Sequence, residues 1–277
     1  MPTVPLDAAN RSQNDARTLV IKRSGRSASD RALELLNREL SEDWNIQHCG
    51  SSRTPDGVLR TCDSVLRCVL CSLYRLAERR ADLTAGLRYA PDAALVTLTR
   101  SHGVRPLAEE WDTTESILRK FTNRSDWSRF QKRHDITGYS ISVETTGSAN
   151  GWHVHVHALL AFGHRLDPGA VERLTTAVST RWCNAAALIG HHADRNLQTV
   201  EMIRTRSDRE QAAEYVTKQH LLHRAPSSRV GRYPADLLAG AKSGDADDIE
   251  LYREYLNAAF NRDFIRAYGT LSSHFKN

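Results

Sequence analysis

Hydrophobic and polar residues alternate most strictly in the segment from Gly151 to Phe162, which reads GWHVHVHALLAF. Residues two apart in a β-strand point to the same face of the sheet. His153, His155 and His157 therefore share one face, and the apolar residues between them share the other. The pattern predicts a strand that packs its apolar face on a core and presents three imidazoles on the opposite face.

The preceding segment, Ile136–Thr146, alternates in the same way and is predicted to form a hairpin with the histidine strand. Residues directly opposite each other in an antiparallel pair point to the same face. If the apolar faces of both strands meet one core, Glu144 must pair with an odd-numbered residue such as His153 or His155. The alternation thus places a carboxylate on the histidine face.

The remaining periodicities predict helices interspersed with further strands. Helix is also expected within 106–134. A further helix is predicted to begin at Pro168, which suits the first helical position, and Asp167 before it can cap that helix. This order predicts an α+β fold in which a mainly antiparallel sheet carries helices on one face and leaves the other face open for a substrate. The predicted strands are 93–99 and 197–203, and the predicted helices are 30–40, 72–87, 168–188, 207–219, 234–240 and 247–260.

Composition divides the chain into four regions. A disordered tail is expected over 1–28, which is rich in Ser, Arg, Asn and Asp without periodicity. A helix and a Cys-rich block follow over 29–88, and the strands lie within 89–225. The stretch Arg224-Ala225-Pro226-Ser227-Ser228 indicates a linker, and 226–277 is predicted to be a small helical C-terminal extension.

The charge and hydropathy of the chain narrow the class of protein. Its 277 residues carry a net charge of +5, which fits a nucleic-acid partner without requiring one. No apolar run approaches the length of a membrane span, and the first residues are polar and do not resemble a signal peptide. We therefore expect a cytoplasmic protein with no membrane partner.

The histidine face has the chemistry of a divalent metal site. Two imidazoles and the carboxylate of Glu144 suit a cation that keeps positions open for a phosphate oxygen. The alternative is a half-buried strand whose polar face carries histidines, with Glu144 as a solvated carboxylate. The spacing alone leaves both interpretations open.

The Cys-rich block within 29–88 contains the pattern C-x12-C-x5-C-x2-C, formed by Cys49, Cys62, Cys68 and Cys71. Four cysteines at this spacing fit a structural zinc site, although four unligated cytosolic thiols are the alternative. Such a site could brace DNA contacts from nearby arginines, which could equally form a solvated helix face. These arginines are Arg53, Arg60, Arg67, Arg75, Arg79 and Arg80.

A helix is predicted to begin at Ser207, where the sequence SDRE matches a capping box. Tyr215 lies two turns later and shares a helical face with Gln211 and Lys218. A tyrosine hydroxyl is a poor nucleophile because its ordinary pKa is about 10. A metal-bound phosphate and a neighbouring lysine would assist it. Taken alone, however, the spacing favours an ordinary packing tyrosine.

In their order along the chain, these motifs resemble those of HUH endonucleases, and in particular the replication initiators of rolling-circle plasmids of the actinobacterial type. His155-Val156-His157 resembles their His-hydrophobe-His motif, and Glu214-Tyr215-Val216-Thr217-Lys218 resembles their Tyr-x-x-Lys motif. Leu95-Val96-Thr97-Leu98-Thr99 resembles their first motif. Cys68-Val69-Leu70-Cys71 and the block that starts at Gly231-Arg232-Tyr233 resemble flanking blocks, so that the resemblance covers about residues 45–260.

The resemblance implies that 89–225 is an HUH catalytic domain with a ferredoxin-like core, which nicks and rejoins single-stranded DNA at a plasmid origin. His155 and His157, with Glu144 as a third ligand, would hold Mg²⁺ or Mn²⁺. Tyr215 would attack the DNA, leaving a 5′-phosphotyrosine and a free 3′-OH, and Lys218 would orient the phosphate. The implied partners are origin DNA, a host helicase and a host DNA polymerase.

The chain departs from the family pattern at one position. Initiators of this group are expected to carry a carboxylate one helical turn before the tyrosine, as the base for the terminating hydrolysis, but this chain has Gln211 there. Glu210 is the nearest substitute. His153 lies outside the two-histidine motif and has no role assigned by it.

Two other functions fit parts of the pattern. A single-tyrosine HUH transposase shares the order of motifs, whereas relaxases of the common kind carry their tyrosine before the histidines. A non-catalytic, zinc-dependent DNA-binding repressor would need the cysteines but neither Tyr215 nor an open metal site. A zinc nucleobase deaminase is excluded because its His-x-Glu and Pro-Cys-x-x-Cys motifs are missing from the sequence.

Overall fold

A computed structural model describes residues 28–57, 59–148, 150–218 and 231–272. The tail expected over 1–28, except its last residue, and the linker expected over 224–228 lie outside these ranges. No helix in the described part of the chain combines the length and apolar character that crossing a membrane requires.

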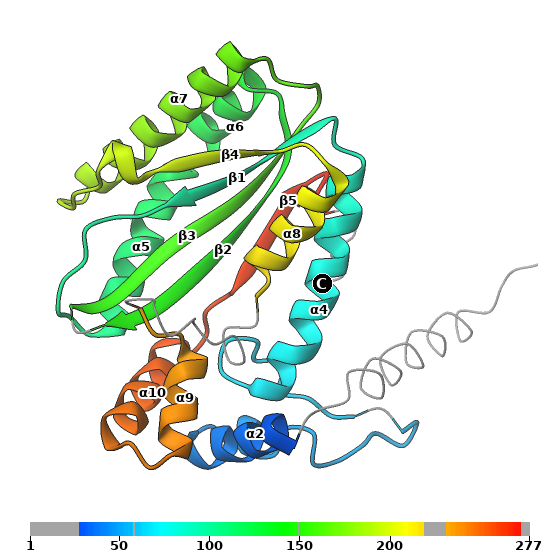
Figure 1. Cartoon of the computed structure of the whole chain (residues 1–277), viewed down its shortest axis with the longest axis vertical. Coiled ribbons are helices and arrows are strands. Elements are labelled where there is room, and N and C mark those ends of the chain that lie inside the picture. Colours follow the sequence, from blue (N-terminus) through cyan, green and yellow to red (C-terminus); the bar gives the residue numbers. More distant parts are fainter. Residues whose placement is uncertain (1–27, 58, 149, 219–230, 273–277) are drawn as a thin grey trace, which may run out of the picture.

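A five-stranded antiparallel sheet forms the centre of the molecule, with the strand order β4-β1-β3-β2-β5 (Figure 1). The prediction of an α+β fold with a mainly antiparallel sheet is therefore confirmed. The ends of β1, β2, β3 and β4 agree with the predicted strands to within about two residues, whereas β5 was not predicted. The strands are β1 (Asp92–Leu98), β2 (Ile136–Ser148), β3 (Gly151–Phe162), β4 (Thr199–Ile203) and β5 (Ile265–Gly269).

The hairpin of β2 and β3 has the register that the alternation required. Glu144 pairs directly with His155, and the neighbouring pairs place His157 and His153 on the same face. The tight turn into β3 depends on Gly151, whose φ is +92°. A Cβ atom at this position would lie 2.4 Å from the carbonyl oxygen of Gly103, so a larger residue would displace backbone.

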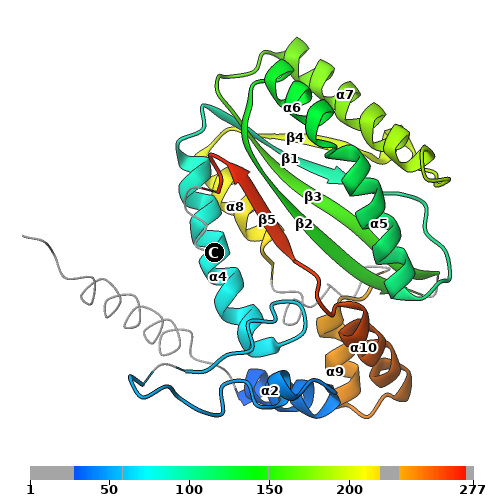
Figure 2. The same ribbon diagram turned by 180° about the vertical axis from the view of Figure 1, so that it is seen from behind.

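Three helices cover one face of the sheet, and Figure 2 shows them in front of it. The even-numbered residues of β3, from Val156 to Phe162, pack against this layer in a large core that includes Phe121 and Trp182. The last of the three helices starts as predicted: Pro168 is at its first turn, and the Asp167 side chain accepts a hydrogen bond from the Ala170 amide. The helices are α5 (Leu107–Phe121), α6 (Arg124–Arg133) and α7 (Pro168–Ala187).

The expectation that helices cover only one face is wrong. Helices α4 (Val69–Arg88) and α8 (Arg206–Val216) pack on the second face through a separate apolar cluster. The reason is that Leu159 and Ala161 continue the odd-numbered face of β3 beyond His157 with apolar side chains, and both are fully buried. That half of the face must be covered, whereas the half that carries the histidines borders the end of α8.

The Cys-rich block packs against the C-terminal helices at one end of the sheet. The Asn37 amide donates to the Tyr252 hydroxyl at 2.9 Å, and the Arg67 Nε donates to the Leu256 carbonyl at 2.7 Å. Residues far apart in the sequence thus share one apolar cluster. Helices α2 (Ala28–Leu40), α9 (Pro234–Lys242) and α10 (Ala246–Ala258) contribute to this cluster. The short helix α3 (Trp44–Gln47) instead packs its Ile46 among the cysteines.

Strand β5 returns from these helices to the sheet and pairs with the outer edge of β2. The region expected to be a purely helical extension therefore contributes a strand. The short edge strand carries Arg266 and the partly exposed Tyr268, and none of its residues is fully buried, so it lacks the apolar alternation that reveals a half-buried strand.

Candidate functional site

Glu144, His155 and His157 form a cluster in which one potential ligand atom from each residue lies within 4.8 Å of the others. The Nε2 atoms of His155 and His157 lie 2.8 and 2.6 Å from the same carboxylate oxygen, Oε2 of Glu144. Two imidazole nitrogens and a carboxylate oxygen that converge in this way are a ligand set for a divalent cation. The residues that the sequence nominated as metal ligands therefore lie together.

The environment favours an ionised carboxylate at Glu144 and a neutral imidazole at His157. Burial alone would raise the pKa of Glu144, which is only 2 % exposed, but hydrogen bonds from His155 and His157 and the charge of Lys218 outweigh it and lower the pKa. Burial lowers the pKa of His157. An ionised carboxylate beside a neutral imidazole can share a cation.

Strand β1 fixes the orientation of His157. Thr97 and His157 are direct partners on the neighbouring strands β1 and β3, and the Thr97 hydroxyl lies 3.1 Å from Nδ1 of His157. A hydrogen bond on one ring nitrogen determines the tautomer and points the other nitrogen at the ligand position. The Nδ1 atom of His155 is buried, and no described residue hydrogen-bonds to it.

Tyr215 lies directly against this cluster. Its ring meets the His157 ring edge-on, with 4.8 Å between the centroids, and 39 % of the residue is exposed. The ammonium group of Lys218 lies 4.5 Å from the centroid of the Tyr215 ring and forms an ion pair with Oε1 of Glu144. The structure thus joins the tyrosine, the lysine and the metal-ligand cluster into one site that is open to solvent at the tyrosine.

Helix α8 carries Tyr215 on its last turn, but it begins differently from the expected start. Its cap is Thr205, not Ser207, and Asp208 completes the capping box with it. The helix ends at Val216, so Lys218 lies just beyond it and reaches back to Glu144. The cap was misassigned because Thr205 and Ser207 both have hydroxyls three residues before an acidic side chain.

Tyr233 is a site residue that we did not assign a role from the sequence. Its hydroxyl lies 2.9 Å from the Lys218 Nζ, and its ring centroid lies 4.7 Å from the same atom. Tyr233 is 4 % exposed. The lysine is therefore enclosed between two tyrosine rings and Glu144, an arrangement that limits its movement.

Glu210 does not join the site. Its carboxylate pairs with Nε of Arg206 at 2.9 Å, and it lies five positions before Tyr215, about 140° around the helix. Gln211 lies on the same face of α8 as Tyr215, but its amide donates a hydrogen bond to the Ser207 hydroxyl. The prediction of Glu210 as a catalytic base thus receives no support from its position.

His153 extends the histidine row away from the cluster. Its Nε2 lies 2.7 Å from the Thr99 hydroxyl, and its ring stacks on His102 with 4.6 Å between the centroids. Burial, reinforced by the positive charge that His155 carries when protonated, lowers the pKa of His153 from 6.5 to about 4. His153 therefore stays neutral in the folded protein at neutral and mildly acidic pH.

This shift predicts a pH-dependent stability. The unfolded chain binds a proton on His153 near pH 6.5, whereas the folded protein does so near pH 4, so the free energy of unfolding should fall as the pH decreases through this interval. The His153→Gln variant, which keeps an amide for Thr99, should lose less stability over the same interval. Denaturant unfolding between pH 7 and 4 measures the free energy of unfolding of the wild type and of His153→Gln. The control is His164→Gln, the same exchange at an exposed position. Equal pH slopes for wild type and His153→Gln would contradict the prediction.

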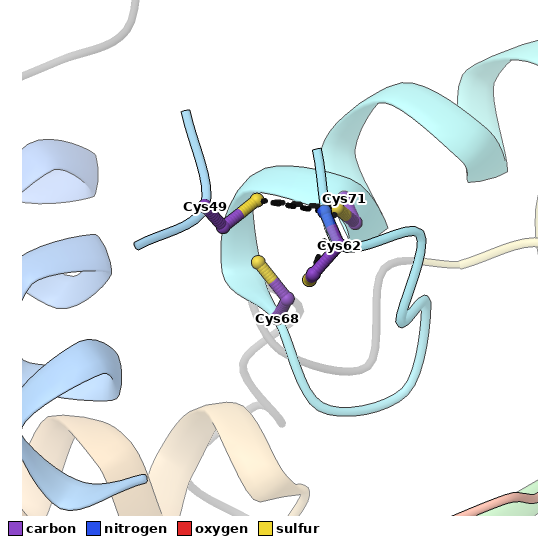
Figure 3. Close-up of side chains that lie close together, drawn as sticks. All are labelled: Cys49, Cys62, Cys68 and Cys71. Atoms are coloured by element: carbon purple, nitrogen blue, oxygen red, sulfur yellow. Dashed lines mark hydrogen bonds between the residues drawn. The ribbon is translucent and has the colours of Figure 1, made fainter. Parts of the chain in front are cut away.

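The four cysteines of the Cys-rich block also converge, and Figure 3 shows their side chains pointing toward one another. The Sγ atom of Cys71 lies 3.5 Å from that of Cys49 and 3.6 Å from that of Cys62. Sulfurs that bind one tetrahedral zinc ion at about 2.3 Å are separated by about 3.8 Å. The cluster therefore has the size of a four-thiolate metal site.

Local structure brings these cysteines together. Cys49 follows α3, Cys62 lies in the loop after it, Cys68 caps α4, and Cys71 is in the first turn of that helix. Hydrogen bonding from the other thiols lowers the pKa of Cys49, and the proximity of Cys49 raises the pKa of Cys71. Four crowded sulfurs that compete for protons are favourable ligands for a cation.

Several arginines of the Cys-rich block are engaged within the protein. Arg67 is 7 % exposed and pairs with Asp43 at 2.8 Å. Arg75 pairs with Asp63, and Arg80 lies 3.4 Å from Glu214. Arg67 is consequently a structural residue and not a surface contact.

The structure therefore assembles two groups of metal-ligand side chains, one of them beside an exposed tyrosine. Comparison with known proteins adds no relative, because no family model, no curated protein and no solved structure matches this chain.

Proposed function

We propose that the chain is a rolling-circle replication initiator of the HUH type, which nicks and rejoins single-stranded DNA through Tyr215. The observation that carries the proposal is the edge contact between Tyr215 and His157 in the Glu144–His155–His157 cluster, with the Lys218 ammonium group 4.5 Å from the centroid of the Tyr215 ring. A nucleophile, a cation site and a positive charge within a few ångströms are the parts that phosphoryl transfer requires.

In the proposed reaction, the phenolic oxygen of Tyr215 forms a bond to the phosphorus of a DNA phosphodiester while the bond to the 3′-oxygen breaks. The tyrosine releases its proton, and the leaving oxygen takes one up, so the step consumes no other reactant. It leaves a 5′-phosphotyrosine and a free 3′-hydroxyl that can prime synthesis. Rejoining is the same exchange in reverse.

The residues around Tyr215 have separate roles in this step. His155, His157 and Glu144 would hold Mg²⁺ or Mn²⁺, which when bound neutralises negative charge on the phosphate. Lys218, held by Glu144 and Tyr233, places a positive charge beside the Tyr215 ring, which would favour the negative charge that the phenol gains when it loses its proton. The exposed edge of Tyr215 leaves room for the strand.

The Cys49–Cys62–Cys68–Cys71 cluster would bind a structural Zn²⁺ in this proposal. All four positions are filled by thiolates, which is the composition of a closed structural site and leaves no position for a substrate. Such an ion would tie the loop before α4 to the first turn of that helix. Plasmid origin DNA, a host helicase and a host polymerase are the proposed partners.

Covalent capture tests the proposed activity. Purified protein incubated with Mn²⁺ and a randomised single-stranded DNA pool should yield an adduct that survives denaturing electrophoresis. Mass spectrometry of the digested adduct should locate the nucleotide on Tyr215, and sequencing of the trapped strand should give the nick site. The His155→Ala/His157→Ala double variant should form no adduct.

The outcome also separates the alternatives. Absence of an adduct, together with metal-independent binding to duplex DNA, would favour a non-catalytic zinc-dependent repressor. An adduct whose trapped strands share a consensus that matches transposon ends and not plasmid origins would favour a single-tyrosine transposase.

A further inference from the structure

Four arginines line a small pocket at the C-terminal end of α4 and the N-terminal end of α8. These two helix ends lie side by side (Figure 1). The pocket has a volume of about 350 Å³, and six residues line it. They are Thr84, Arg88, Arg204, Arg206, Arg209 and Glu210. Four guanidinium groups from separate segments around one cavity are unusual, because like charges repel unless an anion lies between them.

The acidic side chains nearby do not balance this charge. Among the residues that the structure describes, Glu210 is the single carboxylate that lines the pocket, and it pairs with Arg206. Asp92 lies behind the pocket, 3.7 Å from Arg204, and also accepts a hydrogen bond from the Leu166 amide. Arg88 is exposed, and no carboxylate of the described residues pairs with it. The pocket keeps a net positive charge.

Neutral backbone groups hold one of the guanidinium groups in place. Arg209 donates to the Leu87 carbonyl at 2.7 Å and also contacts the Arg88 carbonyl at the end of α4. Its Nε is buried, and no acceptor among the described residues reaches it. Arg204 similarly donates to the Leu166 carbonyl at 3.0 Å. These bonds position the positive charges without neutralising them.

The helix terminus itself does not supply the binding groups. The amide of Asp208 already donates to the Thr205 hydroxyl, and the amide of Thr205 donates to Asp208. An anion in this pocket would therefore be bound by guanidinium groups. Their planar arrangement of donors matches the oxygens of a phosphate group.

We propose that this pocket binds a phosphate group at a site separate from the one around Tyr215. Positions 206 and 215 are half a turn apart around α8 and about 14 Å apart along its axis, so one phosphate cannot occupy both. If the chain binds DNA as proposed above, the phosphate is part of the strand backbone, on the order of 14 Å or more from the reacting bond. Otherwise, the pocket takes a free phosphate.

The test compares Arg88→Gln/Arg206→Gln with Arg119→Gln/Arg129→Gln, which removes the same charge from the surface of α5 and α6. The probes are a short fluorescent oligothymidylate at several salt concentrations and inorganic phosphate at matched ionic strength, both without added divalent cations. If the strand occupies the pocket, the pocket variant should bind the oligonucleotide roughly tenfold more weakly, and its salt slope should fall by about 0.7 per lost phosphate contact.

If free phosphate is the ligand, phosphate should raise the thermal midpoint of the wild type and of the control pair but not that of the pocket variant. Equal behaviour of the two double variants toward both probes would overturn the proposal. Glu210→Gln is a second test that leaves all four arginines intact, and it should tighten binding of whichever probe occupies the pocket. Neither probe requires nicking, so a protein that fails covalent capture can still show the phosphate site.

Discussion

Replacing Tyr215 with phenylalanine is expected to abolish the covalent protein–DNA adduct. Phenylalanine keeps the ring that contacts His157 and Lys218 but removes the oxygen that attacks phosphorus. Loss of the nucleophile should reduce adduct formation by on the order of a thousandfold or more, because the cation site and the lysine cannot replace it. Denaturing electrophoresis with a strand that contains the captured nick site measures the effect.

The matched control for this exchange is Tyr268→Phe. Tyr268 has a similar exposed fraction, 42 % against 39 % for Tyr215, and lies on β5 against Tyr139. This variant should form the adduct at the wild-type rate, and the Tyr215→Phe variant should still bind the strand. Persistence of the adduct in Tyr215→Phe would place the nucleophile elsewhere and contradict the proposed reaction.

Cys71→Ser is expected to release the proposed zinc ion and to destabilise the N-terminal block. Cys71 is 1 % exposed, and its sulfur lies 3.5 Å from that of Cys49 and 3.6 Å from that of Cys62. Structural zinc binding contributes about 10–16 kcal/mol in small domains, so even a partial loss should be large. We expect zinc content to fall from one ion per chain to none, and Tm to fall by about 2–4 °C for each kcal/mol lost.

Cys183→Ser provides the comparison, because Cys183 lies in α7, outside the cluster. It should keep its zinc and a nearly unchanged Tm. A chelator added to the wild type should reproduce the effect of Cys71→Ser, and re-addition of zinc should reverse it. Full zinc content in Cys71→Ser would show that the four thiols do not form the ion's binding site.

The hairpin of β2 and β3 was predictable because a half-buried strand has a period of two. This period identified the faces of both strands, and parity then required that Glu144 pair with an odd-numbered histidine. The proximity of Cys49, Cys62, Cys68 and Cys71 was similarly suggested by their spacing. In both cases the relevant residues are close in sequence or related by a short-range rule.

Features that depend on distant segments were not predictable. The pocket arginines come from two helices and a loop, with more than 100 residues between Arg88 and Arg204, so no local pattern links them. Tyr233 reaches Lys218 because the chain passes the end of the hairpin just before α9, where Arg232 pairs with Gly147. The helices on the second face were not predicted because the three histidines indicate a polar face. Leu159 and Ala161 continue this same face with apolar side chains that need a cover.

The position of β5 in the sheet has a consequence for how the chain reaches this structure. β5 follows β2 by more than 100 residues, yet it pairs with the outer edge of that strand. During synthesis, the edge of the strand that carries Glu144 thus stays without its partner while α7, β4, α8, α9 and α10 are made. An unpaired edge next to a hydrophobic layer invites pairing with other chains, so slow elongation through this interval, or truncation before Ile265, should favour aggregation over folding.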